Sequence, residues 1–202
     1  MAQQRFPRLR FVPTYSIAIV LMLLGFGAVI AGCTVPPAES TTPGGPASLA
    51  ITAPAPEAWR SADAINSECD GDARVLQGIT VQRSAAGFAR ATFEIGGAPP
   101  CYRIGLVDET LQDGSGNQIE LHAPQGLRVE LLGFDPSVPS SGGALEPGYS
   151  IAGDGTYIFN VLFSSLFEQS ATSFIGVNEG SEFAVQTLTN PTRVIVDVKR
   201  AD

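Results

Sequence analysis

Hydrophobic and polar residues alternate with a period of two in many short stretches of the C-terminal part of the chain. In Gly87–Ile95, alanine, phenylalanine and isoleucine occupy every second position near the end, with arginine, threonine and glutamate between them. In Arg193–Lys199, three valines share one face, and Arg193, Asp197 and Lys199 share the other. This period predicts strands with one buried face and one face in water.

Nine stretches rich in β-branched and aromatic residues lie between clusters of Gly, Pro, Asn and Asp, as is typical of strands joined by turns. The predicted strands are Val75–Arg83, Gly87–Ile95, Cys101–Val107, Gln118–His122, Leu127–Phe134, Thr156–Phe163, Ser173–Val177, Glu182–Leu188 and Arg193–Lys199. Tyr157–Phe163 is nearly apolar throughout, which predicts a central strand, and Leu162–Gln169 has a helical turn or two as an alternative. The predicted fold class is all-β, an antiparallel β-sandwich, with a partly open barrel as the alternative.

The segment Ser16–Cys33 organises the N-terminal part of the chain. Arginines precede it, an apolar run fills it, and small residues end it, which is typical of a secretory signal peptide. Its last four residues, Ile-Ala-Gly-Cys, resemble the lipobox of bacterial lipoproteins. That resemblance implies cleavage between Gly32 and Cys33, and a diacylglycerol on Cys33 that anchors the protein to the cell membrane.

An uncleaved transmembrane helix is the alternative for this segment. Ser16–Gly32 is near the lower limit of about 17 residues for a spanning helix, and it contains three glycines. Both alternatives place the rest of the chain outside the cytoplasm. Two acyl chains give stable anchoring, whereas one chain alone binds a membrane only marginally.

A tether rich in Pro, Thr, Ser, Gly and Ala follows the leader, and its composition predicts a disordered, semi-stiff spacer. We assign 1–32 to the signal peptide, 33–72 to a linker anchored at Cys33, and 73–202 to the β domain. Within the linker, Glu57–Asp72 is ambiguous and has a short helical turn as one alternative. Trp59, the only tryptophan, is expected to cover an edge of the core, with contact to a sugar as the alternative.

The charge of the chain limits its partners. The formal net charge is −8, and removal of the leader takes away Arg5, Arg8 and Arg10, which leaves −11. Nucleic-acid binding and adsorption to anionic lipid both depend on clustered Lys and Arg, so neither is expected. The acidic surface favours solubility and identifies no partner.

Two cysteines remain besides Cys33, and an even pair in an exported chain predicts a disulfide between Cys69 and Cys101. Closing such a loop stabilises a fold by about 3–4 kcal/mol in the chain-entropy model. Two free thiols are the alternative. With one histidine and no clustered ligands, we predict no metal site and no cofactor.

Three stretches resemble the AMIN-like domain of bacterial envelope lipoproteins, which is similar to the AMIN domain of cell-wall amidases and secretins. They are Gly87–Ile95 (GFARATFEI), Cys101–Glu109 (CYRIGLVDE) and Phe183–Val198 (FAVQTLTNPTRVIVDV). Ala89 stands where the family usually has aspartate, so a contact between that acid and Arg90 is not expected here. The resemblance implies a small β-sandwich that contacts peptidoglycan or an envelope protein.

Three residues within these stretches carry chemistry suited to sugars or carboxylates: Arg90, Tyr102 and Arg193. We list them as candidate ligand-binding residues. The alternative is structural: Arg193 and Asp197 lie on one side of a strand, and such residues fix the register with neighbouring strands.

Catalysis finds little support in the sequence. A Ser–His–acid triad would need His122, the only histidine, which falls in a predicted strand without a nucleophile elbow. No spacing of acidic residues singles out a catalytic pair. The loop Asp113–Asn117 has oxygen-bearing side chains at alternate positions, but Gln118 stands where a calcium loop requires glycine. We therefore expect a protein that is not an enzyme.

The leading hypothesis is a lipid-anchored envelope protein whose β domain binds cell-wall glycan without catalysis. A protein–protein adaptor of the envelope is the second hypothesis, and an envelope hydrolase is the weakest.

Overall fold

A computed structural model describes residues 54–56, 58–69, 71, 73–137 and 143–201. The leader, the cleavage site, Cys33 and the tether up to residue 53 lie outside the described residues, as do Glu57, Asp70 and Asp72. The described residues contain strands and no helix, so none of them forms a helix that is long and apolar enough to cross a membrane. They belong to the compact unit Ile51–Asp202.

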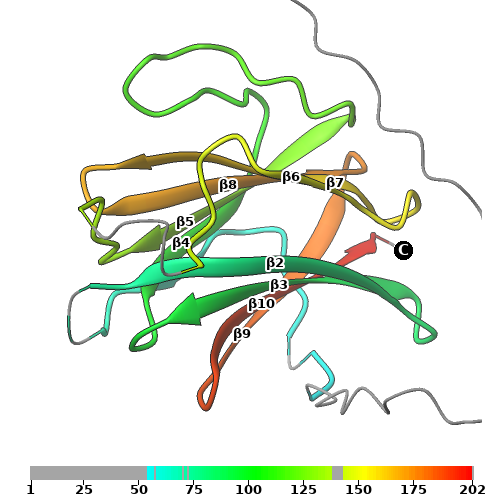
Figure 1. Cartoon of the computed structure of the whole chain (residues 1–202). Helices are drawn as coiled ribbons and strands as arrows, with labels where there is room; N and C mark the ends of the chain where they lie inside the picture. Colours follow the sequence, from blue (N-terminus) through cyan, green and yellow to red (C-terminus); the bar gives the residue numbers. More distant parts are fainter. Residues whose placement is uncertain (1–53, 57, 70, 72, 138–142, 202) are drawn as a thin grey trace, which may run out of the picture. The chain divides into compact units, whose positions relative to one another are not determined.

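Two antiparallel sheets make up the fold, as predicted, and they stack as the layers of a sandwich (Figure 1). The six-stranded sheet has the order β1 (Ala64–Asn66), β4 (Cys101–Val107), β5 (Gln125–Leu132), β8 (Ser170–Val177), β7 (Ile158–Phe167) and β6 (Ser150–Ala152). The four-stranded sheet has the order β2 (Val75–Ser84), β3 (Phe88–Gly96), β10 (Thr192–Arg200) and β9 (Ser181–Leu188).

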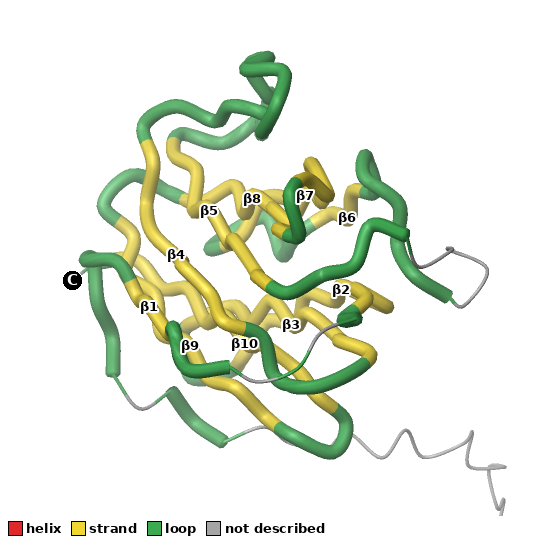
Figure 2. Tube along the Cα trace, turned by 90° about the vertical axis from the view of Figure 1, so that its left-hand side faces the viewer, coloured by secondary structure: helices red, strands yellow, loops and turns green. Residues whose placement is uncertain are grey.

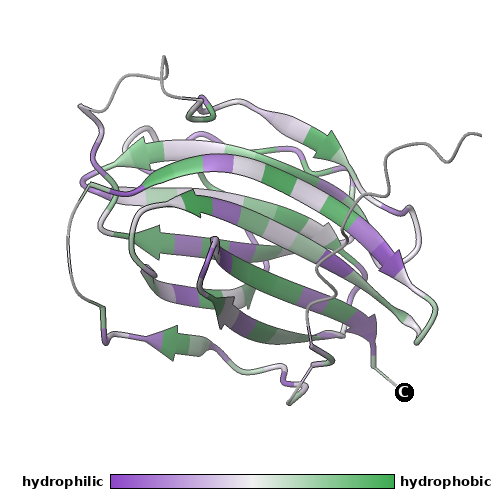
Figure 3. Cartoon of the chain, turned by 60° about the horizontal axis from the view of Figure 1, so that its bottom comes forward, coloured by the Kyte–Doolittle hydropathy of each residue, from purple (hydrophilic) through white to green (hydrophobic). Residues whose placement is uncertain are grey.

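The core lies between the sheets and is built from the alternating apolar positions. Phe93 of β3 and Val196 of β10 face Val129 of β5 and Ile175 of β8, and all four side chains are fully buried. Hydrophobic and hydrophilic bands accordingly alternate along the strands in Figure 3. Because the period of two recurs in strands of both sheets, the sequence pattern specifies which face of each strand is inside.

Eight of the nine predicted strands are present, and one is wrong. Residues 118–122 form a loop, which contributes only a single bridge between Leu111 and Gln118. The helical alternative at Leu162–Gln169 is also wrong, because β7 continues to Phe167 through an irregularity between Phe163 and Ser165. β7 lies between β8 and the three-residue edge strand β6, so it is paired on both sides but is the second strand from the edge and not the predicted central strand.

A strand replaces the helical turn that was an alternative for Glu57–Asp72. Ala64–Asn66 forms β1 and pairs with β4, and the two lie side by side in Figure 2. Arg60 exchanges backbone hydrogen bonds of 2.9 Å in both directions with Phe183 of β9. The described residues of 54–69, within the segment that the sequence predicts as linker, therefore contact both sheets.

The disulfide between Cys69 and Cys101 is present, as predicted, with its Cα atoms 5.2 Å apart. Beside it lies Arg74, which is only 1 % exposed. Its guanidinium donates to the carbonyl oxygens of Ala98 (2.9 Å), Gly71 (2.6 Å) and Pro99 (2.9 Å). The disulfide and Arg74 together fix the segment before β2 against the start of β4. A disulfide in such a domain indicates a location outside the cytoplasm.

Candidate binding surface at one end of the sandwich

The turn between β6 and β7 is organised by the carboxylate of Asp154. One of its oxygens, Oδ1, accepts hydrogen bonds from the backbone N–H groups of Thr156 (3.3 Å), Tyr157 (3.0 Å) and Ile158 (2.8 Å). Short polar side chains commonly bond the backbone ahead of them in this way, and the bonds hold a turn in one conformation. The Asp154 side chain is 6 % exposed. Tyr157 and Thr156 are therefore presented from a rigid turn.

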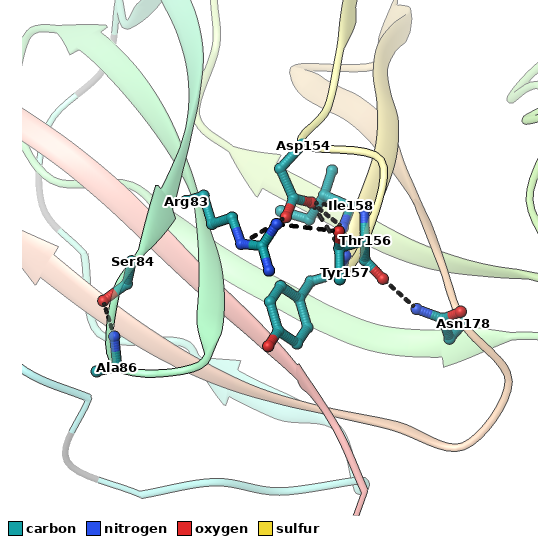
Figure 4. A network of polar contacts seen from close by, with 8 residues as sticks. All are labelled: Arg83, Ser84, Ala86, Asp154, Thr156, Tyr157, Ile158 and Asn178. Atoms are coloured by element: carbon teal, nitrogen blue, oxygen red, sulfur yellow. Dashed lines mark hydrogen bonds and ion pairs between the residues drawn. The ribbon is translucent and has the colours of Figure 1, made fainter.

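Arg83 reaches this turn from the opposite sheet. It lies opposite Ala89 in the register of β2 and β3, in the row of side chains that face between the sheets. Its Nη1 donates to Thr156 Oγ1 at 3.3 Å, and its Nε lies 3.9 Å from Asp154 Oδ2. The guanidinium stacks over the ring of Tyr157, 5.6 Å from the ring centroid (Figure 4). The two sheets thus meet at an arginine and a tyrosine.

A second arginine joins the same network. Asn178, in the turn between β8 and β9, donates from Nδ2 to the carbonyl oxygen of Thr156 at 2.8 Å. Arg200, at the end of β10, donates from Nη2 to Asn178 Oδ1 at 3.4 Å. Polar contacts therefore continue across this end of the sandwich, from Arg83 through Thr156 and Asn178 to Arg200. We call these four residues, with Asp154 and Tyr157, the sandwich end.

The sandwich end has the chemistry to bind polar or anionic ligands. The Arg83 side chain is 58 % exposed, so its ion pair with Asp154 is screened by water and holds it weakly. Among the described residues, its remaining N–H groups have no protein partner, and a guanidinium can donate to sugar hydroxyls or to both oxygens of a carboxylate. An aromatic ring beside it provides an apolar face for a sugar or a peptide.

Arg90 is placed differently from Arg83. Its Nε and Nη2 donate to the two carboxylate oxygens of Asp197 at 2.6 and 2.8 Å, and Nη2 also donates to the carbonyl oxygen of Pro54 at 2.8 Å. The Arg90 side chain is 13 % exposed, and Asp197 is fully buried. Arg90 and Asp197 are cross-strand partners in the register of β3 and β10.

This pair corrects one expectation from the sequence. Asp197 does not face water, because the described residues of 54–60 lie over this face of the four-stranded sheet. Ala89 still leaves no acid beside Arg90 in the chain, and Arg90 pairs instead with Asp197 of the neighbouring strand, as the structural alternative expects. Alternation alone does not reveal that a second layer covers a face that the pattern marks as polar.

The covering layer is the described part of Pro54–Arg60, which we call the strap. The ring of Trp59 packs edge-on against Phe88, with centroids 5.8 Å apart, and Lys199 Nζ lies 5.4 Å from the Trp59 centroid. Gln186 Nε2 donates to the carbonyl oxygen of Ala55 at 2.9 Å. Trp59 therefore contributes to the cover of this face.

Tyr102 and Arg193 do not join Arg90 in one site. Tyr102 of β4 packs against the core from the six-stranded sheet, where burial raises the pKa of its hydroxyl and the charge of Arg60 lowers it. Arg193 shares the outer face of the four-stranded sheet with Arg90, four positions along β10 from Asp197. Among the described residues, its buried Nε has no hydrogen-bond partner.

The residues of the sandwich end were missed by sequence reasoning. The Asp-Gly pair at residue 154 is typical of a turn, but nothing in the sequence places Arg83 or Arg200 beside it. The only sequence signal for this surface was a tyrosine shortly after such a turn. The arginines are brought there by the way the two sheets stack.

His122 lies in the loop between β4 and β5 and is exposed. It lines an open cavity of about 420 Å³ with Asp108 and Glu120, and none of the hydrogen bonds among the described residues involves its ring. Both carboxylate oxygens of Asp113 are engaged, one by Arg128 at 2.9 Å and the other by Ser165 at 3.3 Å. Within the described part of the chain, no group of three or more His, Cys, Asp or Glu side chains is placed to hold a metal.

The AMIN-like domain family matches residues 74–200, from the residue before β2 to the last residue of β10. No match to this sequence was found among curated proteins or solved structures.

Proposed function

The chain belongs to the AMIN-like domain family, and on that premise we propose that it is a non-catalytic binding protein of the cell envelope that holds peptidoglycan at the sandwich end. Its diacylglycerol on Cys33 anchors it in the membrane, and the tether carries the β domain toward the wall. The disulfide between Cys69 and Cys101 supports the location outside the cytoplasm.

One observation carries this proposal: Arg83 is exposed and stacks over Tyr157, which the Asp154 turn holds in place. Peptidoglycan offers sugar rings, hydroxyl groups and the free carboxylates of its peptides. The ring of Tyr157 suits the apolar face of a sugar, and the guanidinium groups of Arg83 and Arg200 suit the carboxylates. Two cations in one network of polar contacts also favour an anionic ligand at this end of an otherwise acidic domain.

The absence of catalysis is part of the proposal. Among the described residues, the single histidine has no hydrogen bond to an acid or a nucleophile, and the carboxylate of Asp113 is occupied by Arg128 and Ser165. The sandwich end holds one carboxylate, Asp154, which is engaged by three backbone N–H groups.

A sedimentation assay with purified peptidoglycan sacculi tests the binding. A soluble form that begins at residue 34 should sediment with the sacculi, and the Arg83→Ala/Tyr157→Ala variant should bind at least about tenfold more weakly because each polar or aromatic contact contributes about 1 kcal/mol. Arg103→Ala, which removes an exposed arginine from β4, is the matched control and should bind normally. Equal retention of all three proteins would exclude the sandwich end as the binding surface.

The anchor is tested separately, by labelling the full chain with a radioactive fatty acid in its host. Labelling should be lost in the Cys33→Ala variant. Persistent labelling of that variant would contradict the anchor without affecting the binding site.

A further inference from the structure

One oxygen of the Asp154 carboxylate is left without a donor inside the domain. Its Oδ1 accepts the three backbone N–H groups of the turn. Its Oδ2 is buried, and among the described residues it has no hydrogen-bond partner. The cation paired with it, Arg83 Nε, lies 3.9 Å away, which is too far for a hydrogen bond. A buried acceptor without a donor costs free energy, so such an oxygen is unusual in a native fold.

Two other aspartates of the domain have donors on both carboxylate oxygens. Asp197 accepts from Arg90 at 2.6 and 2.8 Å. Asp113 accepts from Arg128 at 2.9 Å and from Ser165 at 3.3 Å. The free acceptor is therefore a feature of the sandwich end and not of aspartates throughout this fold.

The charges around Asp154 Oδ2 restrict the ligand that suits this position. The Arg83 side chain beside it is 58 % exposed, and its guanidinium has N–H groups available for a ligand. A lone cation at Oδ2 would be repelled by that guanidinium, and a lone anion at Arg83 would leave Oδ2 without a donor. A ligand that carries both an ammonium and a carboxylate supplies charged donors for Asp154 and two acceptor oxygens for Arg83.

We propose that the sandwich end recognises an ammonium and a carboxylate carried on one carbon atom, as at the free end of a diamino acid in a peptidoglycan stem peptide. This inference rests on the proposed function and narrows its ligand to one part of the wall peptide. The ammonium donates to Asp154 Oδ2, and the carboxylate accepts from the guanidinium of Arg83. Arg83 moves outward to admit the ammonium, which its exposed and weak ion pair permits.

The surroundings of the two charges suit the rest of such a ligand. The ring of Tyr157 lies under the Arg83 guanidinium, and its apolar face can contact the methylene chain of the diamino acid (Figure 4). Gly155 follows Asp154 in the turn. Among the described residues beyond its chain neighbours, no atom lies within 4 Å of the place that a Cβ would take on Gly155. No side chain therefore closes this side of the turn.

Chemical modification of the wall tests the inference with the full chain extracted in detergent. Sacculi whose stem peptides contain a diamino acid are used untreated, after acetylation of their amino groups, and after amidation of their carboxyl groups. Acetylation removes the ammonium, and amidation removes the carboxylate. In a sedimentation assay, the wild type should bind each modified wall at least about fivefold more weakly than the untreated wall, because each loses a charge-assisted hydrogen bond.

Two matched variants assign the ammonium to Asp154. Asp154→Asn keeps an oxygen for the turn but replaces the second oxygen by an amide nitrogen. It should bind untreated sacculi at least about fivefold more weakly than the wild type and lose no further affinity on acetylation. Asp135→Asn makes the same change in another turn, beyond the far end of β5, where Oδ1 accepts the Ser137 N–H at 2.8 Å. This control should respond to acetylation as the wild type does.

The outcomes separate this inference from the proposed function. Wild-type binding that is unchanged by acetylation would overturn the inference and leave wall binding intact. An Asp154→Asn variant that still loses affinity on acetylation, as the wild type does, would overturn it as well. Failure of the wild type to sediment with untreated sacculi would contradict the proposed function itself, and the inference with it.

Discussion

Two of the arginine–aspartate pairs in the structure differ in their surroundings. Arg90 and Asp197 lie in adjacent strands of one sheet, in bidentate contact at 2.6 and 2.8 Å under the strap. Arg83 and Asp154 join the two sheets at an open end, with 3.9 Å between Nε and Oδ2. Both guanidinium groups also stack on an aromatic ring, Phe88 for Arg90 and Tyr157 for Arg83.

The difference shows how burial divides the same chemistry between stability and binding. Under the strap, both partners have lost water, so each depends on the other and neither has donors or acceptors to spare for a ligand. At the sandwich end, the Arg83 side chain is 58 % exposed and has N–H groups available for a ligand. The Asp154 carboxylate instead accepts hydrogen bonds from backbone N–H groups of its own turn. We therefore assign the first pair to the fold and the second to recognition.

The largest expected effect comes from breaking the covered pair. Asp197→Asn leaves the Arg90 charge in a covered site without its counter-ion, and should lower the free energy of unfolding by about 3 kcal/mol or more. Urea denaturation of the soluble form measures this. In the Arg90→Met/Asp197→Leu variant no charge is left unpaired, so the loss should be clearly smaller than for Asp197→Asn. A loss below about 1 kcal/mol in Asp197→Asn would show that the pair is not structural.

The Asp154 turn should give the next largest effect. Asp154→Ala removes the acceptor of three backbone N–H groups, and should lower the free energy of unfolding by about 1–3 kcal/mol. Asp154→Asn retains an acceptor oxygen and should cost less. The same denaturation experiment measures both, and equal losses in the two variants would mean that charge, rather than hydrogen bonding, holds the turn.

Removal of Arg83 should hardly affect stability. Its ion pair is exposed, so Arg83→Ala should change the free energy of unfolding by no more than about 0.5 kcal/mol. The same variant should lose affinity for sacculi. The Asp197→Asn variant should keep that affinity in the fraction of its molecules that remains folded. If Arg83→Ala destabilised the domain as much as Asp197→Asn, the two pairs would have the same role.

The smallest effect concerns pH. Burial raises the pKa of Tyr102 above its ordinary value of 10.0, and the nearby charge of Arg60 opposes this. With a pKa raised in the folded state, the native protein binds the proton more tightly than the unfolded chain. The contribution to stability is thus complete below about pH 10 and is lost as the pH rises through the folded pKa.

Melting temperatures measured from about pH 9 upward should therefore fall less steeply for Tyr102→Phe than for the wild type. If the melting temperatures of the two proteins fell in parallel with rising pH, Tyr102 would titrate in the folded protein as it does in the unfolded chain.

Period and turn residues were sufficient to predict the strands that pack in the core. Gly87–Ile95 and Arg193–Lys199 alternate cleanly, and each appears as β3 or β10 within a residue of the predicted bounds. The prediction was wrong at Gln118–His122, because its short apolar run fits a strand but its backbone passes over the six-stranded sheet. There the Cβ of Ala123 and the backbone oxygen of Leu121 lie close to Gly176 of β8.

Short edge strands such as β1 and β6 lack enough residues to show a period, so sequence analysis did not find them. The site was harder to predict for another reason. Arg83 and Tyr157 are 74 positions apart in the chain and come together only because the two sheets stack. Nothing in the sequence shows that Pro54 and Trp59 lie over the strand of Arg90, so the cover over its pair with Asp197 could not be predicted.

A titration of the ¹⁵N-labelled soluble domain with soluble peptidoglycan fragments, followed by NMR, tests the division between these regions most directly. We predict that backbone signals of Thr156, Tyr157 and Asn178 shift with increasing fragment concentration, while those of Arg90, Asp197 and the strap stay in place. Shifts confined to the strap and the outer face of the four-stranded sheet, or no shifts at all, would contradict the account.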